Sequence, residues 1–285
     1  MSTKINDLKP IAYSCNGKSL TFIKPLIMAV INLTPDSFYD GGKYDTALNV
    51  LKDAEQKILD GADILDLGAA SSRPNASEIS EEEEWQRLKE VLPLLRKNFP
   101  EVFLSVDTYR SDIAKKSAAE GVDIINDISA GNMDEHMFET VVDLQLPYVM
   151  MHMQGTPATM QNNPIYDDVT GSILQEFKLK TERLEQAGFH KIILDPGFGF
   201  GKTLQHNYTL LKELQRFETL PYPILAGLSR KSMINKVIGT NPVTALNGTT
   251  VLNTLALLNG ASILRVHDVA EARQVIQLME VYKQS

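Results

Sequence analysis

The chain has 285 residues and a formal net charge of −8, from 28 Lys and Arg against 36 Asp and Glu. This acidic balance argues against a nucleic-acid binder, and 43% hydrophobic with 22% charged residues excludes wholesale disorder. The single cysteine, Cys15, excludes an internal disulfide and a cysteine-rich zinc site. No run approaches the ~18 consecutive apolar residues that span a bilayer, so we expect a soluble, cytoplasmic protein with no membrane partner.

The first elements along the chain are two short strands. Asn16-Gly17 is a favoured two-residue hairpin turn, and it separates the segments 11–15 and 19–23. We therefore expect residues 1–24 to form a β-hairpin that caps the bottom of the domain that follows.

Eight short apolar runs alternate with helix-like segments from Pro25 to the C-terminus. The runs are rich in Ile, Val and Leu and are bounded by Gly, Pro, Asn or Asp, as is typical of buried parallel strands. Between them, 46–60 carries an apolar stripe, and another segment opens at Ser80 with Glu83 three residues later, the pattern of a capping box. The predicted strands are 26–33, 62–67, 102–106, 122–125, 148–151, 191–194, 224–226 and 262–266.

The spacing of these runs indicates the architecture. From Asn32 in the first run to Arg265 in the last, the chain advances by about 33 residues per unit, enough for one strand, one helix and two loops. Eight such units predict a single α/β domain over residues 25–285, a (β/α)8 TIM barrel. A doubly wound open sheet is the alternative, but eight evenly spaced units favour a closed barrel.

Polar residues follow nearly every predicted strand. In (β/α)8 barrels the functional groups gather at the carboxyl ends of the strands. Turn formation alone would place some Asp and Asn there, but Lys, Arg and His are not favoured turn residues. The sequence therefore predicts a polar site at this end, with the candidates Asn32, Ser71, Ser72, Arg73, Asp107, Asn126, His152, Asp195, Lys231, Arg265 and His267.

The last strand ends in a pattern suited to phosphate. Arg265 and His267 are two residues apart, so on a strand they face the same side while Val266 faces away. A guanidinium beside an imidazole binds phosphate through charge-assisted and bidentate hydrogen bonds. The alternative is that Asp268 neutralises Arg265.

The segment 195–203, DPGFGFGKT, resembles a nucleotide-binding loop only in part. A phosphate-binding loop requires glycine where Pro196 stands, and the dinucleotide fingerprint requires glycine where Lys202 stands. We interpret the segment as a glycine-rich turn whose backbone approaches a flat ligand, with Phe198 or Phe200 stacking on it.

Two carboxylates and an amide suit the edge of a planar heterocycle with an amino group. Asp107 and Asp195 can accept paired hydrogen bonds, and Asn126 can both donate and accept. The alternative role of Asp107 and Asp195 is to cap helices. His152 is either a hydrogen-bonded structural histidine or a catalytic one. The neighbouring methionines belong either to the core or to the wall of a pocket.

The loop after the first strand, 32–42, is rich in Pro, Asp and Gly and is long enough to act as a lid. Asn32 stands at its root, where a side-chain oxygen suits a magnesium ion that keeps most of its waters and binds substrate phosphate. The sequence thus offers one weak metal candidate.

Taken together, these strings resemble the dihydropteroate synthase family over nearly the whole chain after Pro25. The matching motifs are NLTPDSF at 32–38, SRP at 72–74, SVDT at 105–108, IND at 125–127, DPGFGFGK at 195–202, SRKS at 229–232 and RVHD at 265–268. The resemblance implies a TIM barrel that condenses 6-hydroxymethyl-7,8-dihydropterin diphosphate with p-aminobenzoate, giving 7,8-dihydropteroate and pyrophosphate. It also implies a homodimer, dependence on Mg²⁺ and sensitivity to sulfonamides.

The resemblance also implies roles for individual residues. Two loop residues, Asp36 and Arg73, would close over the substrates and build the p-aminobenzoate site, and Lys231 and Ser232 would lie near the benzoate carboxylate. Asn32 would help to carry magnesium. The pterin would be held by Asp107, Asn126, Asp195 and Lys231 between Met150 and Phe200, and the diphosphate by Ser72, Arg265 and His267.

The second loop departs from the family pattern. The usual Gly-Gly-Glu-Ser-Thr-Arg-Pro-Gly is here GAASSRPN at 68–75, so Ala70 removes a carboxylate and Asn75 replaces a glycine.

Two rival functions are considered: a pterin-binding methyltransferase domain, which shares the pterin pocket but needs no diphosphate site, and a non-catalytic barrel that only binds pterins. The first-loop motif and the Arg265–His267 pair favour the synthase.

Overall fold

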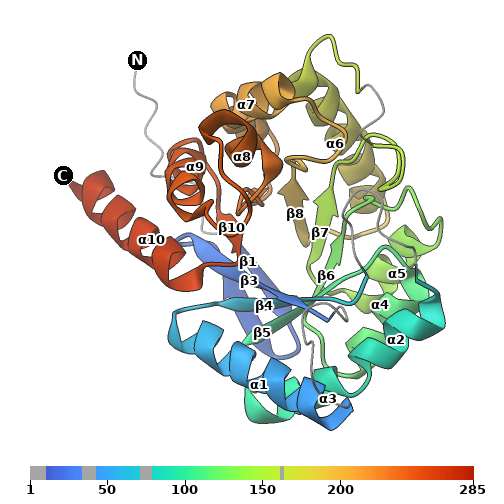
Figure 1. The fold of residues 1–285 in the computed structure, drawn as a ribbon. Helices are drawn as coiled ribbons and strands as arrows, with labels where there is room; N and C mark the ends of the chain where they lie inside the picture. The colour runs from blue at the N-terminus through green and yellow to red at the C-terminus, as the bar shows by residue number, and fades with distance from the viewer. Residues whose placement is uncertain (1–10, 34–42, 71–78, 161–163) are drawn as a thin grey trace.

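The computed structural model describes residues 11–33, 43–70, 79–160 and 164–285; Asp36, Ser71, Ser72, Arg73 and Asn75 lie outside these ranges. Eight parallel strands lie at the centre of the molecule, and the helices surround them (Figure 1). The strand order is β8-β7-β6-β5-β4-β3-β10-β9, and a bridge between Leu194 and Ile224 joins the two edges into a nearly closed barrel. The predicted TIM barrel is confirmed.

Each predicted apolar run overlaps one barrel strand, although β4, β5, β6 and β8 end one or two residues later than predicted. The runs are apolar because helices cover the outer face and side chains fill the interior, leaving the strands buried on both sides. In β4, for example, all five residues are buried, including Asp66. The strands are β3 (Leu26–Asn32), β4 (Ile64–Gly68), β5 (Phe103–Asp107), β6 (Ile124–Asp127), β7 (Tyr148–Met151), β8 (Ile192–Asp195), β9 (Leu225–Ala226) and β10 (Ile263–Val266).

Local capping sets several helix starts. Ser80 accepts a hydrogen bond from the backbone N–H of Glu83 at 3.1 Å, which is one half of the predicted capping box. Thr203 forms a full capping box with His206. No helix within the described residues is long and apolar enough to cross a membrane. The helices are α1 (Lys43–Leu59), α2 (Glu81–Leu88), α3 (Val91–Asn98), α4 (Ser111–Ala119), α5 (Met137–Leu144), α6 (Val169–Gln186), α7 (Leu204–Lys212), the 3₁₀ helix η2 (Leu214–Thr219), α8 (Ser232–Ile238), α9 (Leu246–Leu258) and α10 (Val269–Gln284).

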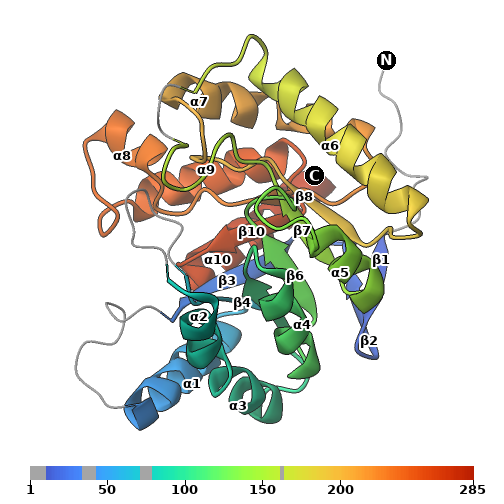
Figure 2. The same ribbon diagram turned by 90° about the vertical axis from the view of Figure 1, so that its right-hand side faces the viewer.

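A separate antiparallel hairpin, β1 (Ala12–Cys15) and β2 (Lys18–Thr21), precedes the barrel. Its turn residues Asn16 and Gly17 both have positive φ, 48° and 76°, as a two-residue hairpin turn requires. The Tyr13 hydroxyl donates to the carbonyl of Ile192, the first residue of β8, at 2.7 Å. The hairpin therefore lies at the amino ends of the strands, and Figure 2 shows it at the right of the barrel with α8 at the left.

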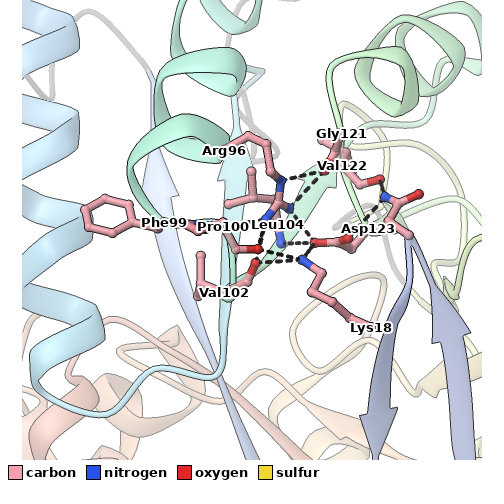
Figure 3. Close-up of polar contacts among 10 residues, drawn as sticks. Lys18, Arg96, Phe99, Pro100, Val102, Leu104, Gly121, Val122 and Asp123 are labelled. Atoms are coloured by element: carbon pink, nitrogen blue, oxygen red, sulfur yellow. Dashed lines mark hydrogen bonds and ion pairs between the residues drawn. The ribbon is translucent and has the colours of Figure 1, made fainter.

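A buried carboxylate anchors the hairpin. Asp123, directly before β6, is paired with Lys18 of β2 at 2.7 Å and with Arg96 of α3 at 2.5 Å (Figure 3). Its Oδ2 also accepts the backbone N–H of Leu104, and its Oδ1 accepts the side-chain amide of Asn16. Burial of an ionised carboxylate is tolerated here because two cations and two N–H groups satisfy it.

Candidate active site

The strand register brings the predicted polar residues to one mouth of the barrel. Residues paired across parallel strands share a face, and Gly68, Asp107 and Asn126 are paired across β4, β5 and β6. On β10, Val266 is fully buried while Arg265 and His267 on either side are partly exposed, the alternation that their spacing predicts.

Asp66 is the hub of this mouth, and its role is missed by sequence reasoning. Its fully buried carboxylate accepts hydrogen bonds from the Ser105 hydroxyl at 2.6 Å, from Asn126 Nδ2 at 3.0 Å and from Arg265 Nε at 2.7 Å. The available signal is an acidic residue in the middle of an apolar run, because such residues are almost never fully buried unless they are paired.

Arg265 is held by a second carboxylate. Its Nη2 donates to Asp107 Oδ2 at 2.8 Å, so Asp66 and Asp107 clamp one guanidinium. Burial raises the pKa of Asp107 to about 7, although Arg265 opposes this shift. The two carboxylates raise the pKa of Arg265 above its already high value, against the effect of burial. Asp107 therefore contacts Arg265 and is not the N-cap of the helix that follows it, because α4 begins at Ser111 with Arg110 as its N-cap.

The alternative in which Asp268 neutralises Arg265 is wrong. Both oxygens of Asp268 accept from Arg230, Oδ2 from Nε at 3.0 Å and Oδ1 from Nη2 at 2.5 Å. Arg265 pairs instead with Asp66 and Asp107, so its guanidinium lies at the mouth.

His267 stands beside Arg265 as an uncharged group. Its Nδ1 lies 3.0 Å from the Ser229 hydroxyl, which also accepts the His267 backbone N–H at 3.2 Å. Burial and then Arg265 lower the pKa of His267 to about 4. At neutral pH the pair therefore offers phosphate one cation and one neutral imidazole.

Asp195, at the end of β8, and Lys231, after β9, form the part of the mouth next to β10. Asp195 Oδ1 accepts the backbone N–H of Gly197 at 2.8 Å, so this carboxylate caps the turn. It also interacts electrostatically with Lys231 and Arg265. Burial raises its pKa, and Lys231 is the strongest opposing charge. Burial also lowers the pKa of Lys231 to about 8, although Asp195 favours its charged form.

The glycine-rich loop places an aromatic ring against Lys231. The Lys231 ammonium lies 4.7 Å from the ring centroid of Phe200 and donates a hydrogen bond to the carbonyl of Phe198. Phe198 is fully buried in the barrel core, whereas Phe200 is partly exposed. Of the two rings, Phe200 is therefore the one available to a ligand.

The structure puts Met150 on the other face of its strand. Met150 is paired with Asp127 and Leu194, whereas Met151 is paired with Asp195 and so shares the face of the site. Met151 also packs in a small apolar cluster with Phe200, and Met150 belongs to the main core. Met150 is thus not a wall of this mouth, because a shift of one residue reverses the face.

The remaining candidates lie at the rim. A Cβ on Gly68 would lie 3.8 Å from both Asn32 Oδ1 and Asp107 Oδ2, so these two oxygens flank the same glycine. Asn32 is exposed at the end of β3, and Ser232 is exposed at the start of α8. His152 is buried beside Lys202, behind the mouth.

Comparisons with known proteins show the family to which this barrel belongs. A family model described as "Pterin binding enzyme" matches residues 28–267. The dihydropteroate synthase of Escherichia coli strain K12 is 42% identical over 266 residues, which are 93% of this chain and 94% of that protein. This chain belongs to the dihydropteroate synthase family.

Solved structures of this family share the fold. The Xanthomonas albilineans dihydropteroate synthase with 4-aminobenzoic acid has a TM-score of 0.90 and 35% identity, covering 97% of this chain and 100% of that one. The complex of the same enzyme with 7,8-dihydropteroate has a TM-score of 0.87 and 33% identity, covering 96% and 100%. The resemblance drawn from the motifs is confirmed. These relatives are synthases, which favours that function over the methyltransferase alternative.

Proposed function

We propose that this chain condenses 6-hydroxymethyl-7,8-dihydropterin diphosphate with p-aminobenzoate, forming 7,8-dihydropteroate and releasing pyrophosphate. The observation that carries the proposal is the clamp of Asp66 and Asp107 on Arg265, in the barrel mouth that also holds Asp195 and Lys231. It places a rigid cation beside groups that suit a pterin.

The pterin occupies the polar interior of the mouth. Its guanidine-like edge donates hydrogen bonds, which the carboxylates of Asp107 and Asp195 accept, and Asn126 can serve either role. Lys231 donates to a ring acceptor. Met151 and Phe200 provide the apolar walls, with Met151 replacing Met150 in this role.

The diphosphate faces Arg265 and His267, and the family motif assigns Ser72 to the same group. In the reaction, the bond from the methylene carbon to the diphosphate oxygen breaks first, and the p-aminobenzoate nitrogen then forms a bond to that carbon. The electron pair leaves with pyrophosphate, and the nitrogen loses its proton to solvent. Because Arg265 is already oriented by two carboxylates, it stabilises the growing charge without reorganisation.

A magnesium ion fits this mouth when the diphosphate supplies most of its ligands. Asn32 Oδ1 is a hard oxygen donor at the rim, close to the Asp107 carboxylate. Within the described residues, no group of three or more His, Cys, Asp and Glu is arranged to hold a metal. When bound, the ion would neutralise charge on the leaving diphosphate.

The second substrate sits at the outer rim. Lys231 and Ser232 stand at the start of α8, where a cation, a hydroxyl and a helix N-terminus suit a benzoate carboxylate. Asp36 and Arg73 would complete this part from the first two loops. The aniline nitrogen is already nucleophilic, so the reaction requires no strong general base.

We also propose that the chain forms a homodimer in the cytoplasm. Val251, Leu255 and Leu258 are 51%, 39% and 47% exposed on α9, at the spacing of one helical stripe. An exposed apolar stripe of this kind suits a second copy of the chain. The buried free thiol of Cys15 is compatible with a reducing compartment.

The test is a coupled measurement of pyrophosphate release and dihydropteroate formation by the purified protein. Dihydropterin diphosphate is supplied throughout, while p-aminobenzoate and Mg²⁺ are each supplied or withheld. We expect both products to appear in equal amounts and to require both additions. Release of pyrophosphate without dihydropteroate, or no release at all, would reject the synthase.

A further inference from the structure

A buried lysine behind the mouth joins two loops of the barrel. Lys202 directly follows the glycine-rich loop and is only 3% exposed. Its Nζ lies 2.9 Å from the carbonyl oxygen of Gly197, 3.0 Å from that of Phe200 and 3.0 Å from Nδ1 of His152. The first two contacts close the loop after β8 on itself, and the third ties it to the loop after β7.

These three contacts, with the carbonyl oxygen of His152 at a longer 3.4 Å, satisfy all three N–H groups of an ammonium. Burial lowers the pKa of Lys202 to about 7, while Asp195 and Glu176 favour the charged form. His152 accepts through Nδ1, so its proton is on Nε2, which lies 3.4 Å from a Glu176 oxygen. Burial, and then Lys202, holds the pKa of His152 far below its ordinary value, so the ring is neutral and available as an acceptor.

The chain of contacts continues to a third loop. Glu176 of α6 pairs with Lys180 at 2.8 Å, and Lys180 donates to the carbonyl of Ala130 and to Asn132 Oδ1, both at 3.0 Å. Ala130 and Asn132 lie between β6 and α5. Polar groups therefore connect the loops that follow β6, β7 and β8, which are successive around the mouth.

The glycine-rich loop has no room to move closer to its neighbour. A Cβ on Gly197 would lie 1.9 Å from the carbonyl oxygen of His152, and one on Gly201 would lie 2.6 Å from that of Gln154. This loop carries Phe200 and the carbonyl of Phe198, which are the two groups that contact Lys231. The position of the loop consequently determines where Phe200 and Lys231 stand.

We propose that Lys202 is a positioning residue: together with His152, it fixes the loop 197–201 so that Phe200 and Lys231 are held in place for the pterin. The inference rests on the proposed function only in naming the pterin as the ligand. Lys202 acts from behind the site and does not contact substrate in this arrangement.

The test compares Lys202→Met with the wild type by direct titration with dihydropterin diphosphate, and then by the KM of each substrate. We expect roughly tenfold weaker binding of the pterin substrate, as follows from loss of one buried charge-assisted contact. The KM for p-aminobenzoate should rise less than that for the pterin substrate, because of the two positioned groups only Lys231 also stands at the p-aminobenzoate site. Lys191→Met is the matched control, because Lys191 Nζ also donates to two carbonyls, those of Ser14 and Gln145, but at the opposite end of the barrel.

A second pair keeps the proposal testable if Lys202→Met does not fold. His152→Asn retains an acceptor near the position of Nδ1, whereas His152→Leu removes it, so only the leucine variant should lose pterin affinity. Wild-type affinity in Lys202→Met, or equal losses in Lys191→Met, would overturn the positioning role. Failure of the wild type itself to bind the pterin would instead reject the proposed function.

Discussion

Arg265 donates through Nε to Asp66 and through Nη2 to Asp107, so a single guanidinium joins β10 to β4 and β5 across the barrel mouth. The two contacts are 2.7 and 2.8 Å long, and the Asp66 side chain is fully buried. A guanidinium held at two points loses little freedom when it binds the diphosphate. Asp66 thus supports the site although it lies beneath the mouth.

Replacing Asp66 with Asn should damage both stability and catalysis. The amide removes the charge that balances Arg265 and turns an N–H toward other donors, so we expect unfolding to become easier by about 3 kcal/mol. The KM for dihydropterin diphosphate should also rise. Urea denaturation and steady-state kinetics measure these effects. Asp53→Asn, which breaks the surface pair with Lys57, is the control and should change stability by less than ~0.5 kcal/mol.

The activity should decline above pH 8 because of Lys231. Burial lowers the pKa of Lys231 to about 8, so its positive charge is lost as the pH rises through this value. The rate constant kcat/KM for the pterin substrate should fall accordingly. In Lys231→Arg the part of the decline centred near pH 8 should disappear, whatever the absolute rate, and an unchanged decline would assign it to another group.

The lowered pKa of Lys231 should also make the protein more stable as the pH rises, whereas the activity falls. The folded pKa of Lys231 is lower than the ordinary value of 10.5, so between pH 8 and 10.5 the unfolded chain binds more protons than the folded one. The contribution of Lys231 to the free energy of unfolding therefore rises with pH in this window. The difference in stability between wild type and Lys231→Met, measured by urea denaturation at pH 8 and 10, checks this sign.

His267 should act as a neutral hydrogen-bond donor. Its pKa is lowered to about 4, so the ring stays neutral between pH 5.5 and 7.5. The contribution of His267 to diphosphate binding should therefore not change over this range. His267→Gln, which keeps an N–H donor, should retain more affinity for pyrophosphate than His267→Ala, which should lose roughly tenfold. Calorimetric titration with pyrophosphate and Mg²⁺ measures the two variants. Equal losses in both would contradict a donor role.

Asp123 should matter for folding and not for chemistry. Its carboxylate pairs with Lys18 and Arg96 at the amino ends of the strands, far from the mouth (Figure 3). Asp123→Asn leaves two cations without their partner, so we expect a loss of about 3 kcal/mol in the free energy of unfolding. At a temperature where the variant is folded, its kcat and both KM values should equal those of the wild type.

Much of the fold follows from local patterns. The eight strands are visible as apolar runs at a regular spacing, and Asn16-Gly17 and Ser80 mark a turn and a helix start, because backbone geometry favours these residue types there. Asp107, Asn126, Asp195 and Arg265 could be predicted as site residues because parallel strands bring their carboxyl ends together. The structure places these four residues at the same mouth of the barrel.

The rest depends on contacts that sequence spacing does not reveal. The role of Asp66 comes from partners 39, 60 and 199 residues away, and Lys202 meets His152 across 50 residues. Whether Met150 or Met151 faces the site depends on the strand register, because a shift of one residue reverses the face. The neutral state of His267 arises from burial beside Arg265, which is a property of the folded chain.

The most direct measurement is the formation of 7,8-dihydropteroate by the wild type and by Asp195→Asn, with the product identified by mass. The wild type should convert both substrates. Asp195→Asn, which keeps an acceptor for the Gly197 N–H but loses the charge, should show at least ~10-fold higher KM for dihydropterin diphosphate and an unchanged KM for p-aminobenzoate. A wild type without product, or equal KM values in the two proteins, would contradict the site described for this barrel.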